Sequence, residues 1–290
     1  MEKDTPFPGQ ENGLMPHEDE AFRVLCLGDV VGRPGRRVLK ERLPGLRSAH
    51  GVDLVIANGE NAAGGIGLTP DTMRELLSAG VDVITSGNHI WKHKEFYPWL
   101  GKTPNVLRPE NYGPKVPGRG WGLFALPSGL TVGVLNLLGR TFMDPADCPF
   151  AAADAALAAM AAAGTADGTA LCIVDFHAEA SSEKRAMMHH LNGRAALVFG
   201  THTHVQTADA HVTDQGTACI TDIGMCGVEF DSVIGMGREA VLKRFLTGLP
   251  QHFCPAKGDA SMNGILVEIN KKTGKALSIR LLRDKAAAMI

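Results

Sequence analysis

The sequence predicts an α/β fold, because short buried strands alternate with helical patterns along most of the chain. Segments 22–27, 53–57 and 81–85 are runs of apolar and β-branched residues, which is typical of buried strands. Alternation of strands with helices favours layers of sheet and helix packed on each other. The chain shows no internal repeat and no clear linker. We therefore expect one domain over residues 22–290, with a more strand-rich part after residue 216.

The first half of this domain is expected to repeat a strand-then-helix unit. After the first strand, a turn at 32–35 leads into a basic helix that ends near His50. After the second strand, Thr69 is predicted to cap a helix that has Pro70 at its first position, where proline loses no hydrogen bond. Segment 91–122 is rich in Pro, Gly and aromatic residues, so we expect a loop with short helical pieces.

The second half continues the alternation of strands and helices. Three more buried strands are predicted, at 131–138, 170–174 and 195–199. An Ala-rich helix is expected over 145–160, and its small side chains should let it pack closely on a sheet. A second helix should be capped by the polar residues 181–183 and end at 192–193. One further helix is predicted near 238–246.

Composition limits the classes of partner that the protein can have. The chain has 290 residues, of which 44% are hydrophobic and 21% charged, as in ordinary globular proteins. Its 29 Lys and Arg against 31 Asp and Glu give a formal net charge of −2. This balance argues against a long nucleic acid held by its phosphate charge, although it leaves room for a local basic patch.

Cysteine usage and the first residues indicate a reduced, cytoplasmic protein. The six cysteines form no C-x-x-C pair, and several lie inside apolar strands. Residues 1–21 are polar and acidic, without the apolar core of a signal peptide, and are predicted to be a disordered N-terminal extension. The most apolar stretch, 151–164, is too short to cross a bilayer, so no membrane is expected.

Five short motifs rich in Asp, Glu, Asn and His stand at the ends of predicted strands. The carboxyl ends of strands in an open α/β sheet border the crevice where ligands bind. Residues far apart in the sequence are therefore expected to converge on one site. The motifs are Gly28-Asp29, Gly59-Glu60-Asn61, Gly87-Asn88-His89, Asp175-Phe176-His177 and Gly200-Thr201-His202-Thr203-His204.

Two histidines of the last motif are candidate metal ligands. His202 and His204 are separated by one residue, and in an extended chain such residues point to the same side. They could hold one metal together or one metal each. In isolation, such a pair is more often two polar loop residues bonded to backbone. His177, at another strand end, favours the metal site.

The carboxylates and amides of the other motifs extend this candidate site. Glu60 could bridge two cations through its two oxygens, and Asn88 could give a carbonyl oxygen while His89 faces a substrate. Simpler interpretations are a helix cap for Asp29 and ordinary turns for the Asn residues. A phosphate-binding glycine loop at 28–35 is a weak alternative, because its glycine spacing matches no known pattern.

The candidate ligands are carboxylates, amides and imidazoles, without thiolate. This set suits iron, manganese or zinc, and magnesium less well. Two such ions can clamp a phosphoryl group and lower the pKa of bound water to about 7, which supplies hydroxide at neutral pH. The remaining histidines are given no role: His17, His50, His93, His189, His190, His211 and His252.

The motifs together resemble those of the calcineurin-like metallophosphoesterases. The Gly87-Asn88-His89 and His202-x-His204 motifs match this family closely, and His177 matches its isolated histidine. Val31 replaces the histidine of the first family motif, and Glu60-Asn61 replaces its bridging aspartate. Both departures are similar to the YmdB branch of the family. The resemblance extends from about residue 22 to the C-terminus.

This resemblance implies a fold, a reaction and a role for each site residue. The fold would be a four-layer α-β-β-α sandwich with two mixed sheets. The reaction would be hydrolysis of small cyclic nucleotides, most of all 2′,3′-cyclic nucleotides to 3′-nucleotides, at a centre of two metal ions, iron by preference. Asp29 and His204, with Asn61 nearby, would hold the first metal, Glu60 would bridge, Asn88, His177 and His202 would hold the second, and His89 would be the general acid. Without a histidine at Val31 the first metal would lack one imidazole.

Two other functions remain open at this stage. A metal-dependent amidohydrolase could also use an H-x-H pair, although it would need a barrel and usually a carboxylated lysine, and no strand-end lysine is evident. A non-catalytic protein that senses metal or nucleotide could use the loop 91–122 as a recognition surface. A homo-oligomer is possible in any of these cases.

Overall fold

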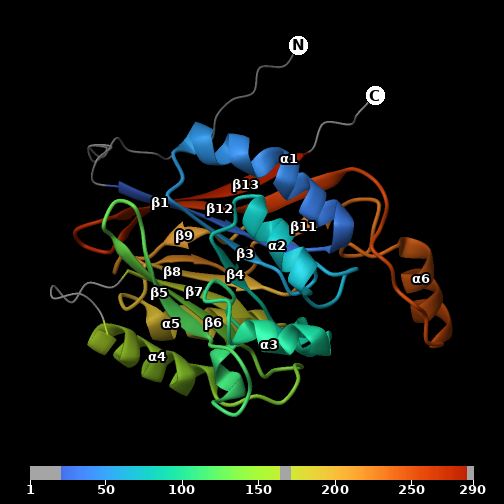
Figure 1. Ribbon diagram of the computed structural model, residues 1–290, viewed down its shortest axis with the longest axis horizontal. Coiled ribbons are helices and arrows are strands. Elements are labelled where there is room, and N and C mark those ends of the chain that lie inside the picture. Colours follow the sequence, from blue (N-terminus) through green and yellow to red (C-terminus); the bar gives the residue numbers. More distant parts are fainter. Residues whose placement is uncertain (1–20, 164–170, 286–290) are drawn as a thin grey trace.

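The computed structural model describes residues 21–163 and 171–285, and these form two β-sheets packed face to face between two layers of helices (Figure 1). This arrangement confirms the predicted four-layer sandwich. The expected disordered extension, 1–21, lies outside the described residues except for Ala21, which begins the first strand. None of the described helices has both the length and the apolar character needed to cross a bilayer.

The first sheet has seven strands, and it is mixed. Strands β1, β3 and β4 run parallel, whereas β12 runs antiparallel to both β1 and β11. Its order is β2-β11-β12-β1-β3-β4, with β13 paired to β12. The strands are β1 (Ala21–Leu27), β2 (Asp29–Val30), β3 (Leu54–Asn58), β4 (Val83–Thr85), β11 (Met225–Val228), β12 (Ala260–Asn270) and β13 (Ala276–Lys285).

The second sheet has six strands, and it is mixed as well. Its order is β5-β6-β7-β8-β10-β9, in which β6, β7, β8 and β10 are parallel and the two edge strands are antiparallel to their neighbours. The strands are β5 (Trp121–Ala125), β6 (Thr131–Leu138), β7 (Leu171–His177), β8 (Leu197–Thr201), β9 (His211–Val212) and β10 (Ala218–Ile220).

Helices cover the outer faces of both sheets (Figure 1). The first sheet is covered by α1 (Gly32–His50) and α2 (Pro70–Ser78), and the second by α4 (Pro149–Ala163) and α5 (Ser181–Leu191). The segment between β4 and β5 contains short helical pieces, as predicted, and α6 lies apart at one end of the molecule. The short pieces and α6 are η2 (Asn88–Trp91), η3 (Lys94–Phe96), α3 (Tyr97–Leu100), η4 (Glu110–Tyr112) and α6 (Arg238–Thr247).

The apolar core forms three layers, one between the sheets and one beneath each pair of helices. The central strands β3 and β7 are buried along their whole length, as expected for parallel strands covered on both faces. Removing this much apolar surface from water is the main favourable term in folding. The same packing holds the carboxyl ends of these strands in fixed positions, which is what a site at the strand ends requires.

Several helix starts differ from the predictions. The expected turn at 32–35 is the first turn of α1, and the Ala-rich helix begins at Pro149 rather than at 145. Thr69 caps α2 as predicted, in a reciprocal arrangement with Thr72. The predicted cap at 181–183 is wrong, because Ala180 occupies that position without a side-chain bond. The Glu183 carboxylate instead accepts hydrogen bonds from the backbone N–H groups of residues 140–141.

Candidate metal centre

Ends of strands from both sheets bring the predicted site residues together. Glu60, His177 and His202 each turn a ligand atom toward the others, and these atoms lie within 4.8 Å of one another. The closest approach is 3.0 Å, from His202 Nδ1 to His177 Nε2, and His177 Nε2 lies 3.2 Å from Glu60 Oε1. Asn88 adds a fourth group, since its Oδ1 is 3.3 Å from His177 Nε2.

A second group of side chains lies on the other side of Glu60. Asp29 Oδ1 is 3.6 Å from His204 Nε2, and the Asn61 amide lies 3.1 Å from the same His204 nitrogen. Asn61 Nδ2 also lies 3.4 Å from Asp29 Oδ1 and 3.3 Å from Glu60 Oε1. Glu60 therefore contacts side chains of both groups, as a bridging ligand would, and Asp29 Oδ2 accepts a hydrogen bond from the backbone N–H of His202 at 3.1 Å.

The two histidines of the H-x-H motif do not lie on an extended chain. His202 has a φ of 98° and His204 a φ of 65°, a conformation that is uncommon for residues with a side chain. The extended backbone assumed for this pair is therefore wrong, although both histidines line the same cavity. His202 contacts His177, whereas His204 contacts Asp29, so each histidine joins a different group. Backbone strain of this kind is concentrated at functional sites.

A buried ion pair holds the bent H-x-H loop in place. Thr203, between the two histidines, donates from its backbone N–H (3.1 Å) and its hydroxyl (2.7 Å) to Asp222 Oδ2. Lys184 Nζ lies 2.7 Å from the same oxygen, and both members of the pair are almost completely buried. Sequence analysis gave no role to Lys184 or Asp222, because nothing in their local pattern distinguishes a buried lysine from an exposed one.

Hydrogen bonds behind the site fix the orientation of two imidazoles. His177 Nδ1 lies 2.9 Å from Thr201 Oγ1, which donates to Asp175 Oδ1 at 2.7 Å. His204 Nδ1 donates to the Ile234 carbonyl at 2.9 Å. Each contact leaves Nε2 of the ring directed into the site. Second partners of this type orient metal-binding histidines in proteins, so Asp175 is placed as a supporting residue.

Two glycines have no room for a side chain. A Cβ atom on Gly87 would stand 2.2 Å from His177 Cδ2 and 2.4 Å from Glu60 Oε2. A Cβ atom on Gly28 would stand 1.9 Å from the Gly224 carbonyl. The glycines at 28–35 thus serve close packing rather than a phosphate-binding loop. The interpretation of Asp29 as a helix cap is wrong too, because Val31 is the N-cap of α1.

Substituting Gly87 with alanine is expected to disturb the site directly. The added methyl group must displace His177 or Glu60, so we expect metal affinity to fall by about 10- to 100-fold, as for other losses of ligand positioning. Metal titration of the purified variant measures this. Gly45→Ala is the matched control, since its Cβ meets nothing within 4 Å and alanine is favoured in a helix by about 1 kcal/mol. Equal metal affinity in both variants would contradict the assignment.

Burial and charge make the site ready for a cation. Burial raises the pKa of the Asp29 carboxyl, but His204 outweighs this effect and leaves that pKa below its usual value. Burial acts on Glu60 in the same way, and His177 and His89 hold the pKa of Glu60 well below its usual range. Among the described residues, neither carboxylate pairs with Lys or Arg. Two fully buried carboxylates with imidazole neighbours and no thiolate fit the predicted metal ligands.

The histidines differ in charge because their surroundings differ. Burial lowers the pKa of His204, but the adjacent Asp29 carboxylate more than reverses this and raises it to about 9. Burial and the neighbouring His177 lower the pKa of His202 to about 4, so this imidazole is neutral at pH 7. A neutral imidazole is the form that binds metal.

A cavity of about 650 Å³ opens onto these residues. Its wall includes His89, which lies on η2 with about a third of its side chain exposed. Much of the remaining wall comes from segments that read locally as loop, and sequence analysis gave a possible role to only one of them, the loop 91–122 that contains Lys92. They include Gly64, Gly65, Lys92, Glu179, Ile234, Met236, Gln251, His252 and Phe253.

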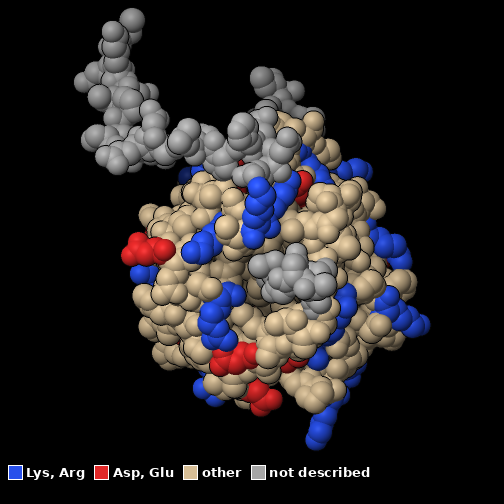
Figure 2. All heavy atoms as spheres, turned by 90° about the vertical axis from the view of Figure 1, so that its left-hand side faces the viewer, with Lys and Arg blue, Asp and Glu red and all other residues tan. Residues whose placement is uncertain are grey.

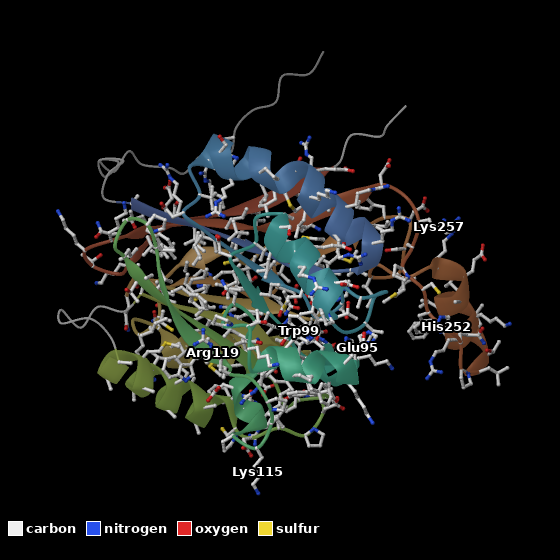
Figure 3. All side chains as sticks on the ribbon, viewed as in Figure 1. Glu95, Trp99, Lys115, Arg119, His252 and Lys257 are labelled. Carbon is white, nitrogen blue, oxygen red and sulfur yellow. The ribbon has the colours of Figure 1, made fainter. Side chains whose placement is uncertain are left out.

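Two of these wall residues matter for the interpretation of the sequence. Glu179 Oε2 lies 3.1 Å from His202 Nε2, so Glu179, which follows the Asp175-to-His177 motif in the sequence, also contacts a candidate ligand. His252 lies on the side of the molecule that carries α6 (Figure 3), and it joins the cavity although it was given no role. His93 stays outside the cavity, with Nε2 3.1 Å from the Ile66 carbonyl.

Comparison with known proteins identifies the family. The model of the YmdB-like protein family matches residues 25–282. The 2′,3′-cyclic-nucleotide 2′-phosphodiesterase of Bacillus subtilis is 44% identical over 258 residues, which cover 89% of this chain and 95% of that protein. A protein of Thermus thermophilus has a similar structure, with 43% identity and a TM-score of 0.83 over 92% of this chain and 100% of that one.

A phosphatase from Mycoplasma pneumoniae has a similar structure too, with 35% identity, a TM-score of 0.84, and coverage of 91% of this chain and 94% of that one. These matches span nearly the whole of each relative, and they confirm the branch that the departures at Val31 and Glu60 indicated. The chain belongs to the YmdB-like protein family.

Proposed function

We propose that this protein is a metal-dependent phosphodiesterase that hydrolyses 2′,3′-cyclic nucleotides to 3′-nucleotides. The observation that carries the proposal is the convergence of two buried carboxylates and three imidazoles, from both sheets, beside a cavity. Family membership and the 44% identical relative, named for 2′-phosphodiesterase activity, support both the reaction and its substrate.

The donor groups divide naturally between two cations. Asp29 and His204, with Asn61 beside them, would hold the first ion, and Glu60 would bridge to the second. Asn88, His177 and His202 would hold the second ion, and iron, manganese or zinc suits these ligands. When bound, the ions supply positive charge to the phosphoryl oxygens and activate water as the nucleophile.

His89 is the residue that we assign to proton transfer. Its Nδ1 lies 2.8 Å from Asn61 Oδ1 and 3.0 Å from Glu60 Oε1, and its backbone N–H donates to Glu60 Oε2. These contacts fix the ring at the cavity wall and leave Nε2 to act on the substrate. From that position His89 would protonate the 2′-oxygen as its bond to phosphorus breaks, which yields the 3′-nucleotide.

Metal removal tests the proposed function most directly. Protein stripped with a chelator is expected to lose essentially all hydrolysis of 2′,3′-cyclic nucleotides, and reloading should restore activity with about two ions per chain, because the proposed ligands form two groups. A panel of cyclic nucleotides, phosphodiesters and phosphomonoesters, assayed with metal analysis on the same batch, measures both. Full activity in the stripped sample would contradict the proposal.

The other functions have less support in the structure. An amidohydrolase would need a barrel, whereas the chain folds as a two-sheet sandwich, and the buried Lys184 is engaged in an ion pair with Asp222. A purely regulatory role predicts that a Glu60→Gln variant keeps full function in the cell. Self-association into a homo-oligomer stays a prediction.

A further inference from the structure

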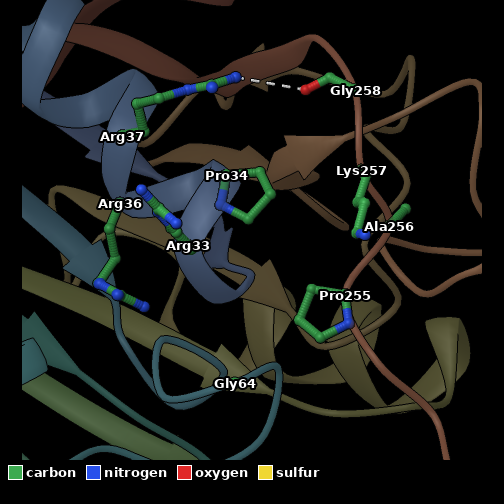
Figure 4. A pocket seen from close by; sticks show the side chains of 9 residues that line it. All are labelled: Arg33, Pro34, Arg36, Arg37, Gly64, Pro255, Ala256, Lys257 and Gly258. Carbon is green, nitrogen blue, oxygen red and sulfur yellow. Dashed lines mark hydrogen bonds between the residues drawn. The ribbon is translucent and has the colours of Figure 1, made fainter.

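A second cavity, with a strongly basic wall, adjoins the candidate active site. Its volume is about 590 Å³, and it lies between the start of α1 and the segment 255–258 (Figure 4). Its wall carries four cationic side chains and no carboxylate: Arg33, Arg36, Arg37 and Lys257. On the face of the molecule in Figure 2, Lys and Arg side chains are spread over the surface, and some of them lie beside Asp and Glu side chains.

Half of this positive charge has no partner within the described part of the chain. Arg33 and Lys257 make no hydrogen bond or ion pair with any described residue. Arg37 donates to the Gly258 carbonyl at 3.3 Å, and its nearest carboxylate, on Glu41, is 4.0 Å away. Only Arg36 is fully engaged, with Glu75 and the Ala62 carbonyl. The cavity therefore presents uncompensated charge to a ligand.

The two cavities adjoin at Gly64. This residue lines both cavities and is exposed, and a Cβ atom there would meet nothing within 4 Å. Close contacts hold the neighbouring segment 255–256 in place. Pro255 packs against Gly32 and Gly65, and the Ala256 N–H donates to the Gly235 carbonyl at 2.8 Å. A flexible ligand could pass over Gly64 with one end in each cavity.

Resting on the proposed function, we propose that the basic cavity binds a backbone phosphate of a short oligonucleotide whose terminal 2′,3′-cyclic phosphate occupies the metal centre. Guanidinium groups pair with phosphate oxygens in a two-pronged geometry, and Lys257 adds a point charge from the opposite side. The near-zero net charge of the chain agrees with a grip on one or two phosphates rather than on a long strand.

The test compares one substrate that reaches the cavity with one that does not. The double variant Arg33→Ala, Lys257→Ala is assayed on a mononucleoside 2′,3′-cyclic phosphate and on a trinucleotide with the same cyclic end. We expect the ratio of kcat/KM for trinucleotide to that for mononucleotide to fall about tenfold, the effect of removing one or two charged hydrogen bonds. An equal fall on both substrates, or no fall in the ratio, would overturn the proposal.

The control removes two exposed lysines from another part of the surface. Lys102→Ala, Lys115→Ala takes away the same charge, and Lys115 lies on a different side of the molecule from Lys257 (Figure 3). This variant should keep the ratio. The salt dependence of trinucleotide binding should weaken in the cavity variant alone, by about 0.7 in the logarithmic slope for each phosphate that the cavity no longer neutralises.

Two further results distinguish this proposal from two alternatives, which are the binding of a free anion and the failure of the proposed function. If a nucleoside 5′-monophosphate changes mononucleotide hydrolysis in the wild type and not in the cavity variant, the cavity binds a free anion and the oligonucleotide proposal is wrong. If metal-loaded protein hydrolyses neither substrate, the proposed function fails. The anisotropy of a fluorescent trinucleotide then still tests the cavity, and a tenfold weaker affinity in the cavity variant alone supports it.

Discussion

Replacing His89 with alanine is expected to lower kcat for 2′,3′-cyclic nucleotides by about 10²- to 10⁴-fold, the usual contribution of a positioned general acid. The metal content should stay near that of the wild type, because His89 stands at the cavity wall and is not itself one of the proposed ligands, although it contacts Glu60 and Asn61. Steady-state kinetics, together with metal analysis of the same preparation, measures both quantities.

An exposed histidine away from the site provides the control for this experiment. His211 lies on the edge strand β9, with its Nδ1 2.8 Å from the Asp209 carbonyl, and His211→Ala should leave kcat unchanged. A His89→Ala protein with wild-type kcat would exclude His89 from proton transfer. A variant that lost its metals together with its activity would instead make His89 part of the metal site.

Replacing Lys184 with methionine is expected to destabilise the fold by about 3–5 kcal/mol. The substitution leaves Asp222 buried without its cation, and an unpaired buried charge carries a cost of that size. Asp222 also accepts both hydrogen bonds from Thr203, so the bent H-x-H loop should lose its anchor and metal affinity should fall. Urea denaturation and metal titration of the variant measure the two effects.

The next residue of α5 offers a matched control. Arg185 pairs with Asp209 at 3.2 Å, but 45% of its side chain is exposed, so Arg185→Met should cost less than about 1 kcal/mol. The substitution of Lys184 is expected to destabilise the fold more because Lys184 is buried, whereas Arg185 is partly exposed. A Lys184→Met protein as stable as the Arg185→Met protein would show that the buried pair contributes little.

The order of strands and helices could be predicted because hydrophobic patterns are local. The buried runs at β1, β3 and β7 are recognisable in the sequence, and so is the capping residue Thr69. The cap proposed at 181–183 failed for a non-local reason. Glu183 is used by backbone N–H groups some forty residues earlier in the chain, which no local pattern reveals.

The composition of the candidate site was predictable for a related reason. Asp29, Glu60, Asn88, His177 and His202 stand at strand ends, and parallel strands bring their ends to one edge of the sheet. The residues alone left open whether the two histidines of the H-x-H motif share one group or divide between two. The family resemblance assigned them to different metals, and the structure places them in different groups. The residue between them, Thr203, is bonded to Asp222, which lies 19 residues further along the chain, so their positive φ angles occur beside a contact that no local pattern reveals.

The sequence by itself determined the alternation of strands and helices, the chemical types of the candidate ligands and the family, because these depend on residue identity and short spacings. Only the tertiary structure decided which side chains come together in the candidate metal centre, which glycines have no room for a side chain, and that Arg33 and Lys257 line one cavity. The physical reason is that contacts between distant segments depend on the packing of both sheets. The net charge of the chain, which is near zero, does not reveal that four cationic side chains line one cavity.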